Sequence, residues 1–334
     1  MYPKVLLVET GYSPLVHIKD SWWSDVIDYQ IYDTVPSWWR RVEKFLRLDI
    51  MLALRVRQIA HQYDIVWANS EKVGIALTGI REPLVVLAHH LASRRKRLIL
   101  RLAGVTRKWA GVGYLTDADR EFIISYYGVA CDRFIRVVAR DLARFSTPES
   151  VVGGPIISLG VSKRDYGTLI GALKELPGFA TEIYAGSRFD DLYHGRTFGP
   201  LPSWVQFKEP VPSDDAPALY RLARFVVVPL ISTTQFSAGM NTVLESGAAG
   251  KAVIATSLPG MSSFVIDGVT GVLVPPHDRQ AMKAAIHMLW TQPEMAHQMG
   301  MAGRKFIESE FNPIIVNENI KKFLTNVHAR YHQP

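Results

Sequence analysis

The stretch FSAGMNTVLESGAAGKAVIAT, from Phe236 to Thr256, decides the fold of this chain. It follows an apolar run at 225–231 that predicts a buried strand, opens with a small flexible loop, and continues as a helix before a second apolar strand. This order of elements suits phosphate binding, because the first turn of a helix presents unpaired N–H groups and a partial positive charge. Gly239 allows a ligand to approach the backbone, and Glu245 is placed to accept hydrogen bonds from a ribose or sugar hydroxyl.

The size and composition of the chain restrict its class. A chain of 334 residues is long for one core and suits two domains, and 48% hydrophobic with 21% charged residues argues against disorder. The net charge of +7 favours an anionic ligand or an anionic membrane surface, and we expect no nucleic acid partner. One cysteine, Cys131, excludes an intrachain disulfide and favours the cytoplasm, and no segment approaches the roughly 20 apolar residues of a membrane-spanning helix.

Short apolar strands alternate with helical patterns in two series, separated by a Ser/Pro/Gly-rich linker near residues 146–155. This alternation predicts an α/β protein with two doubly wound Rossmann-like domains facing a cleft, whose ligands bind beyond the carboxyl ends of the strands. The longest expected helix covers 38–62. Strands are expected at 4–9, 29–33, 65–70, 84–89, 112–116 and 133–138, and then at 156–161, 182–186, 205–208, 225–231, 252–256 and 271–274.

From about residue 156 to 278, the chain resembles the retaining glycosyltransferases of family 4. The resemblance rests on NTVLESGAAGKAVIAT (241–256) together with LPGMSSFVIDGVTGVLVPPHD (258–278), a combination that is highly specific. The first half matches more loosely, at DIVWANS (64–70), VVLAHHL (85–91), YLTDADREFIISYYGV (114–129) and VARDLARF (138–145).

The resemblance implies the GT-B fold, in which each of the two domains binds a different substrate. Residues 1–148 would form an acceptor-binding Rossmann-like domain, residues 149–311 a nucleotide-sugar-binding one, and residues 312–334 a helix that returns to the first domain. It also implies a hexosyltransferase that moves a sugar, with retention, from a nucleotide-diphosphate sugar to a hydroxyl acceptor, either a lipid-linked molecule or a glycan such as a polysaccharide precursor. The nucleotide sugar is a co-substrate, and neither a metal nor another cofactor is expected.

The donor site is expected around the helix that begins near Gly239. Glu245 resembles the family glutamate that holds the nucleotide ribose, and a solvated helix glutamate is the alternative. Ser237 stands where many members have a glutamate that contacts the donor sugar, so the identity of that sugar stays open. Backbone N–H groups that would bind the diphosphate or the sugar belong to Gly239, Met240, Asn241 and Thr242.

A cation should neutralise the diphosphate. The segment ISLGVSKRDYGTLIGAL (157–173) resembles the family segment whose cations do so, although Val161 replaces a common arginine. We choose Arg164 for this role, because a bidentate guanidinium suits phosphate oxygens, with Lys163 as second choice. A solvated helix start is the alternative for both.

The acceptor side is expected in the first half. His89 and His90 end an apolar strand, and because strand side chains alternate, one of them faces the cleft. We choose His89 as a catalytic residue and place His90 and Gly11 on the acceptor side; a packed imidazole and a plain turn are the alternatives. Asp119 is expected to cap a helix. The paired acids Asp190-Asp191 and Asp214-Asp215 are also attributed to capping, so no metal site is expected.

Two basic segments carry tryptophan, SWWRRVEKFLRLDIMLALRVRQIA (37–60) and SRRKRLILRLAGVTRKW (93–109). Tryptophan with Lys and Arg is typical of interfacial segments, so we expect peripheral binding to the inner face of the cell membrane, unless these residues form a solvated face.

Two other functions stay open for the whole chain. One is a GT-B nucleotide-sugar epimerase; the other is a non-catalytic nucleotide-sugar or glycan-binding subunit, which Ser237 and Val161 favour.

Overall fold

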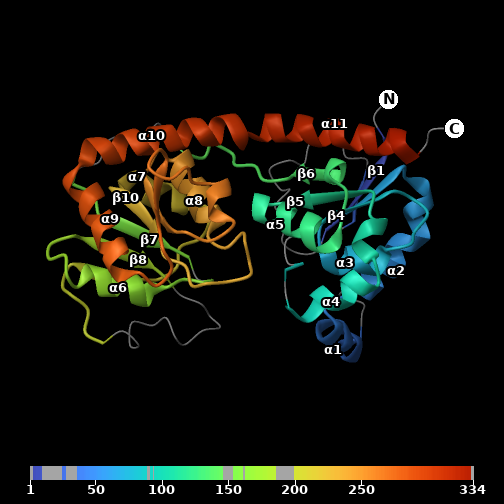
Figure 1. Ribbon diagram of the computed structural model, residues 1–334, viewed down its shortest axis with the longest axis horizontal. Coiled ribbons are helices and arrows are strands. Elements are labelled where there is room, and N and C mark those ends of the chain that lie inside the picture. The colour runs from blue at the N-terminus through green and yellow to red at the C-terminus, as the bar shows by residue number, and fades with distance from the viewer. Residues whose placement is uncertain are drawn as a thin grey trace. The chain divides into compact units, whose positions relative to one another are not determined.

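The computed structural model describes residues 3–9, 25–27, 36–88, 91–92, 94–145, 153–160, 162–185 and 199–331, with the backbone alone at 25–27, 94–96 and 99. The chain divides into two compact units (Figure 1). Unit 1 combines Met1–Ala139 with Pro313–Pro334, and unit 2 is Arg140–Asn312. In the described part of the chain, each unit is built on a six-stranded parallel sheet.

The sheet of unit 1 has the strand order β2-β1-β3-β4-β5-β6. Its central strands read VLLV, IVWA and LVVL and are buried along their whole length, as expected for strands covered on both faces. The strands are β1 Val5–Val8, β2 Asp25–Ile27, β3 Ile65–Ala68, β4 Leu84–Leu87, β5 Gly111–Tyr114 and β6 Phe134–Arg136. The helices are α1 Ser37–Leu46, α2 Ile50–Ile59, α3 Glu71–Leu77, α4 Arg94–Leu102, α5 Asp117–Phe122 and α11 Pro313–Tyr331.

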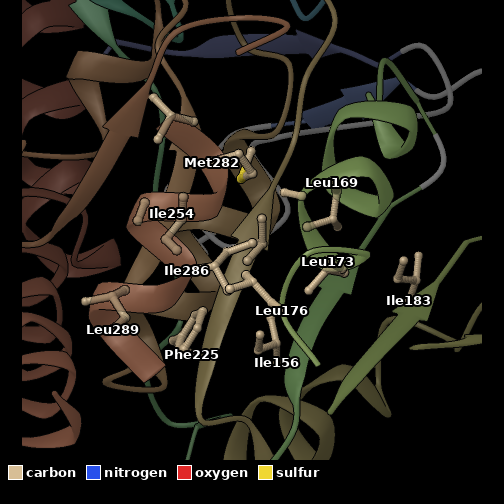
Figure 2. Close-up of a cluster of buried hydrophobic side chains, with 14 of the residues drawn as sticks. Ile156, Leu169, Leu173, Leu176, Ile183, Phe225, Ile254, Met282, Ile286 and Leu289 are labelled. Atoms are coloured by element: carbon tan, nitrogen blue, oxygen red, sulfur yellow. The ribbon is translucent and has the colours of Figure 1, made fainter. Parts of the chain in front are cut away.

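The sheet of unit 2 has the order β12-β11-β10-β7-β8-β9. Figure 2 shows the buried cluster in which side chains of α6 and α9 pack with the sheet, among them Leu169, Ile286 and Phe225. The strands are β7 Ile156–Leu159, β8 Thr181–Tyr184, β9 Val205–Lys208, β10 Phe225–Val228, β11 Val253–Thr256 and β12 Gly271–Val274. The helices are α6 Tyr166–Leu173, α7 Ala216–Leu222, α8 Met240–Ala248, α9 Arg279–Thr291 and α10 Pro293–Glu310. Short 3₁₀ turns lie at Ala60–Gln62, Val105–Lys108, Cys131–Arg133 and Met261–Ser263, and a π turn lies at Ile123–Tyr127.

The last helix, α11, belongs to unit 1, as the sequence predicts (Figure 1). Its Phe323 ring packs so closely on β5 that a Cβ atom at Gly111 would lie 2.5 Å from the ring. At its end, the Arg330 guanidinium donates to the Asp132 carboxylate at 2.8 Å. The helix is therefore fixed to the first sheet by packing and by an ion pair.

Unit 2 begins earlier than residue 149, where the sequence analysis places it. The Arg140 N–H donates to the Phe311 carbonyl at 2.8 Å, so the two points where the chain passes between units are adjacent. Arg144 bonds to Asp214, and the Phe145 ring lies 6.2 Å from the Tyr220 ring. These contacts with the second sheet's helices and loops attach residues 140–145 to unit 2.

The strands lie within a few residues of the expected ranges, apart from 29–33, which falls outside the described residues. The single helix expected over 38–62 is wrong, because the chain forms α1 and α2 instead. Arg47 ends α1 with φ of 55°, in the left-handed region. The Glu43 carboxylate then accepts the Met51 N–H at 2.8 Å, which stabilises the start of α2.

The contact between α10 and the turn that follows α8 supports a prediction about stability. A Cβ atom at Gly300 of α10 would lie 2.1 Å from the Gly250 carbonyl oxygen. Gly300→Ala should therefore lower the free energy of unfolding by about 1–3 kcal/mol, seen as a lower urea midpoint. Overpacking forces the two segments apart and outweighs the higher helix propensity of alanine. Gly153→Ala is the control, since its Cβ meets nothing within 4 Å. An unchanged midpoint for Gly300→Ala would contradict this packing.

Candidate functional site

The site in unit 2 lies at the reversal point of its sheet. Strands β7 and β10 pair in parallel, with Phe225 opposite Ile156, and the chain leaves them toward opposite edges of the sheet. Crevices at the carboxyl ends of such strands are where ligands bind in doubly wound folds. The loop at 160–165 follows β7, and the loop at 229–239 leads from β10 to α8.

Helix α8 begins after the loop that follows β10, at this reversal point, without a side-chain cap among the described residues. Its N-cap residue, Gly239, has φ of 80°, and a Cβ atom there would lie 3.0 Å from Val228, so glycine fits both the conformation and the space. The Met240 N–H closes a turn to the carbonyl of half-buried Ser237 at 3.2 Å and is therefore occupied. The helix start retains the partial positive charge that favours an anion.

Arg164 connects the two loops of the site. Its guanidinium is buried and donates to the Leu159 carbonyl at 2.9 and 3.0 Å, to the Ser162 carbonyl at 3.1 Å and to the Thr242 hydroxyl at 2.9 Å. A Cβ atom at Gly160 would lie 2.2 Å from this guanidinium, and Gly160 has φ of 124°. Arg164 thus reaches the first turn of α8, and its donors stabilise the loop. A phosphate contact by Arg164 stays a prediction.

Lys163, the second choice, is exposed on the same loop. Its carbonyl accepts the Ile231 N–H at 3.1 Å, and its φ of 60° is unusual for a residue other than glycine. The backbone is therefore held in a strained conformation beside the start of α8, while the ammonium group faces solvent. Lys163 is better placed than Arg164 to meet an incoming anion.

Glu245 lies further along α8 and is largely buried, with 15% of its side chain exposed. Its Oε1 accepts from the Arg140 guanidinium at 3.1 Å, and its Oε2 accepts from the Tyr220 hydroxyl at 3.0 Å. Burial raises the pKa of Glu245, against the opposing effects of Arg140 and Tyr220. A carboxylate offers about four acceptor positions, so these two bonds leave capacity for the hydroxyls of a ligand.

Arg140 is a residue of the candidate site that the sequence alone does not indicate. It lies within VARDLARF (138–145), and its Nη2 also donates to the Asn241 side-chain oxygen at 2.9 Å. The burial of Tyr220 and the negative charge of Glu245 beside it raise the pKa of Tyr220 well above its ordinary value. A buried carboxylate requires a cationic partner, but the sequence does not indicate which of its many arginines supplies it.

The residues chosen for the acceptor side, Gly11, His89 and His90, lie outside the described residues, as does Val161. After β5 of unit 1, Asp119 caps α5 as expected: its carboxylate accepts the Thr116 N–H at 3.1 Å and the Thr116 hydroxyl at 2.7 Å. Burial raises the pKa of Asp119 to about 7.

Of the two acid pairs expected to cap helices, the structure describes one. Asp190 and Asp191 lie outside the described residues. Asp215 is the N-cap residue of α7, as expected, but its side chain makes no capping bond there, and Asp214 pairs with Arg144 instead. Within the described part of the chain, no group of three His, Cys, Asp or Glu side chains could hold a metal ion.

Comparisons with known proteins agree with this architecture. The family model for glycosyl transferases group 1 matches residues 183–292. The D-rhamnosyltransferase WbpZ of Pseudomonas aeruginosa is 33% identical over 286 residues, which cover 76% of this chain and 74% of that protein. The D-inositol 3-phosphate glycosyltransferase of Thermobifida fusca is 36% identical over 99 residues, covering 30% of this chain and only 22% of that protein.

Among solved structures, Anabaena Alr3699/HepE in complex with UDP-glucose aligns with a TM-score of 0.74 and 18% identity, covering 97% of this chain and 100% of that one. The two doubly wound units and the returning C-terminal helix therefore have the GT-B fold, which confirms the expected fold class. The chain belongs to the glycosyl transferases group 1 family, which confirms the resemblance drawn from its sequence.

Burial of Asp119 generates a prediction about pH. Its folded pKa of about 7 lies above the ordinary 3.8, so its contribution to stability is complete below pH 4 and is lost as the pH rises through 7. Asp119→Asn keeps an acceptor for Thr116 without the buried charge. The variant should match the wild type at pH 4 and exceed it at pH 8 by roughly 1–4 kcal/mol in urea unfolding. Asp117→Asn, in the same turn, is the control, and a difference independent of pH would contradict the assignment.

Proposed function

We propose that this protein is a retaining glycosyltransferase that moves a hexose from a nucleotide-diphosphate sugar to a hydroxyl acceptor. The observation that carries the proposal is the start of α8, without a side-chain cap, at the reversal point of the second sheet, with the Glu245 carboxylate further along the same helix. Family membership supports the reaction class, and the similar fold of HepE, solved with UDP-glucose, supports the donor class.

In the proposed complex, the diphosphate lies against the first turn of α8, with Lys163 as its accessible cation, and the ribose hydroxyls donate to Glu245. The anomeric carbon loses its bond to the phosphate oxygen and forms a bond to the acceptor oxygen on the same face. The departing phosphate oxygen takes the acceptor's proton. The protein's contribution is orientation and charge stabilisation. The roles of His89, His90 and Gly11 on the acceptor side, of Ser237 near the donor sugar, and the absence of a metal stay predictions.

Donor binding is tested by thermal shift with UDP, GDP and ADP and their hexose conjugates, because a ligand of the native state stabilises it. We expect one nucleotide series to stabilise the wild type. Glu245→Gln should weaken that binding about tenfold or more, since hydrogen bonds to a charged group contribute about 1.5–3 kcal/mol. Glu294→Gln, on the exposed face of α10, is the matched control.

The same preparation separates the alternatives. Acceptor-dependent transfer, with retention and without loss in EDTA, supports the proposal. Turnover of the donor to an isomer without acceptor indicates an epimerase, and binding without turnover over a broad acceptor panel indicates a non-catalytic subunit. Unaltered nucleotide binding in Glu245→Gln would contradict the assigned site.

We also propose that unit 1 binds an anionic membrane surface on the cytoplasmic side. On α1, Trp38 and Phe45 are 61% and 87% exposed, and their spacing of seven residues places them on one face of the helix. On α4, Leu98 and Leu102 are also exposed, one turn apart. Such apolar groups beside cations suit an interfacial position. The exposed cations on or next to these helices are Arg40, Arg41, Lys44, Arg47 and Arg101.

None of the described helices combines the length and apolar character needed to cross a bilayer. The proposed association is therefore tested as surface binding, by co-sedimentation with vesicles of phosphatidylcholine alone or mixed with phosphatidylglycerol. The wild type should bind the anionic vesicles, and Trp38→Ser/Phe45→Ser should lose about tenfold or more, because each buried aromatic contributes about 1.5–3 kcal/mol. Ile314→Ser, an equally exposed apolar site on α11, is the control. Equal binding to both vesicle types would reject the idea.

A further inference from the structure

Arg140 holds two side chains of the candidate donor site. Its own side chain comes from the segment that begins unit 2, outside α8, and the residue is 9% exposed. Its Nη1 donates to Glu245 Oε1 at 3.1 Å and its Nη2 to Asn241 Oδ1 at 2.9 Å. Asn241 and Glu245 are four residues apart, so both lie on one face of α8. One guanidinium thus fixes the orientation of both side chains.

The chemistry of the guanidinium determines what each partner presents. A guanidinium has only donors, so it selects the oxygen of the Asn241 amide and leaves Nδ2 as the donor end of that side chain. It also favours the ionised form of Glu245, which burial alone would disfavour. An ionised carboxylate only accepts hydrogen bonds, as a pair of ribose hydroxyls requires, whereas a neutral carboxyl group is a weaker acceptor.

The other cations around this helix have different partners. Arg164 is bonded to loop carbonyls and to Thr242, and Arg144 is bonded to Asp214 and the Ser213 carbonyl. Strands β10 and β11, which pack on α8, read FVVV and VIAT and carry no titratable group. Among the described residues, the groups that act electrostatically on Glu245 or on its partner Tyr220 are Arg140, Arg144 and Arg164. Lys251 and Arg304 contact the other end of α8, where the Lys251 N–H donates to the Ser246 carbonyl and Arg304 donates to the Ala248 carbonyl.

We propose that Arg140 is a positioning residue for a nucleoside diphosphate: it orients Glu245 and Asn241 so that the carboxylate receives the ribose hydroxyls and the amide donates to the diphosphate or the sugar. The inference rests on the proposed function. Arg140 itself does not touch the ligand in this scheme, since the residue is only 9% exposed, its Nε is buried from solvent, and its two Nη atoms are directed to Glu245 and Asn241. Its effect on binding is transmitted through the two side chains that it holds.

The test uses the full chain and the three nucleoside diphosphates UDP, GDP and ADP, each with its 2′-deoxy analogue, at pH 6 to 9. Arg140→Gln should weaken binding of the ribonucleotide about tenfold or more at pH 6, recover part of it as the pH rises, and lose discrimination against the deoxy form. Arg140→Lys keeps the charge and should keep the pH profile of the wild type, with weaker binding because one ammonium cannot bridge both side chains. Arg221→Gln, an exposed arginine on α7, is the charge-matched control.

A second measurement requires no ligand. The titration of the Glu245 side-chain carboxyl carbon is followed by NMR in the wild type, Arg140→Lys and Arg140→Gln. We expect Glu245 to titrate at a higher pH in Arg140→Gln than in the other two proteins. If the wild type binds none of the three nucleotides, the proposed function fails, whereas the effect of Arg140 on Glu245 is still decided by this titration. An unshifted titration, or a loss of nucleotide affinity that is the same at every pH and equal for the deoxy analogue, would overturn the positioning role.

Discussion

The guanidinium of Arg164 is the interaction on which the second unit's site depends. It joins the end of β7 and the loop after it to the first turn of α8, through the carbonyls of Leu159 and Ser162 and the Thr242 hydroxyl. A buried cation requires this many acceptors, because leaving water without replacing its hydrogen bonds costs several kcal/mol. The same requirement explains Gly160, whose missing side chain makes room for the guanidinium. The loop and the helix start are therefore held in a fixed relation before any ligand arrives, which is the condition for preorganised electrostatic binding.

Three basic residues belong to this candidate site, Arg140, Arg164 and Lys163, and the sequence alone does not show that their surroundings differ. Arg140 and Glu245 form a buried ion pair and largely cancel each other, and Arg164 is surrounded by carbonyl dipoles. Under the proposed function, the net attraction for a diphosphate would therefore come from the partial charge of the α8 terminus and from Lys163, the exposed cation of the β7 loop. This division separates the groups that shape the site from those that meet the ligand.

Most of the fold follows from the sequence, because buried parallel strands are short runs of Val, Ile and Leu that stand out between helical patterns. The break between α1 and α2 does not, since it depends on the Glu43 carboxylate reaching the Met51 N–H. The start of α8 was predictable from its glycine and from the strand before it. Arg140 was not, because its partners lie about a hundred residues away in the chain, and only the folded structure shows that Arg164, rather than Lys163, is buried.

The distribution of sequence similarity has a physical counterpart in the two units. The family model matches 183–292, entirely within unit 2. Unit 1 also has a parallel sheet, but different polar residues follow its strands. Its reversal point lies between β1 and β3, and the residues that follow these strands, Glu9 and Asn69, are buried. Among the described residues, no group bonds to the Asn69 side-chain amide. Under the proposed function, a shared donor chemistry would reside in unit 2, and the choice of acceptor would follow from polar groups at the edge of unit 1, where relatives with different acceptors are expected to differ most.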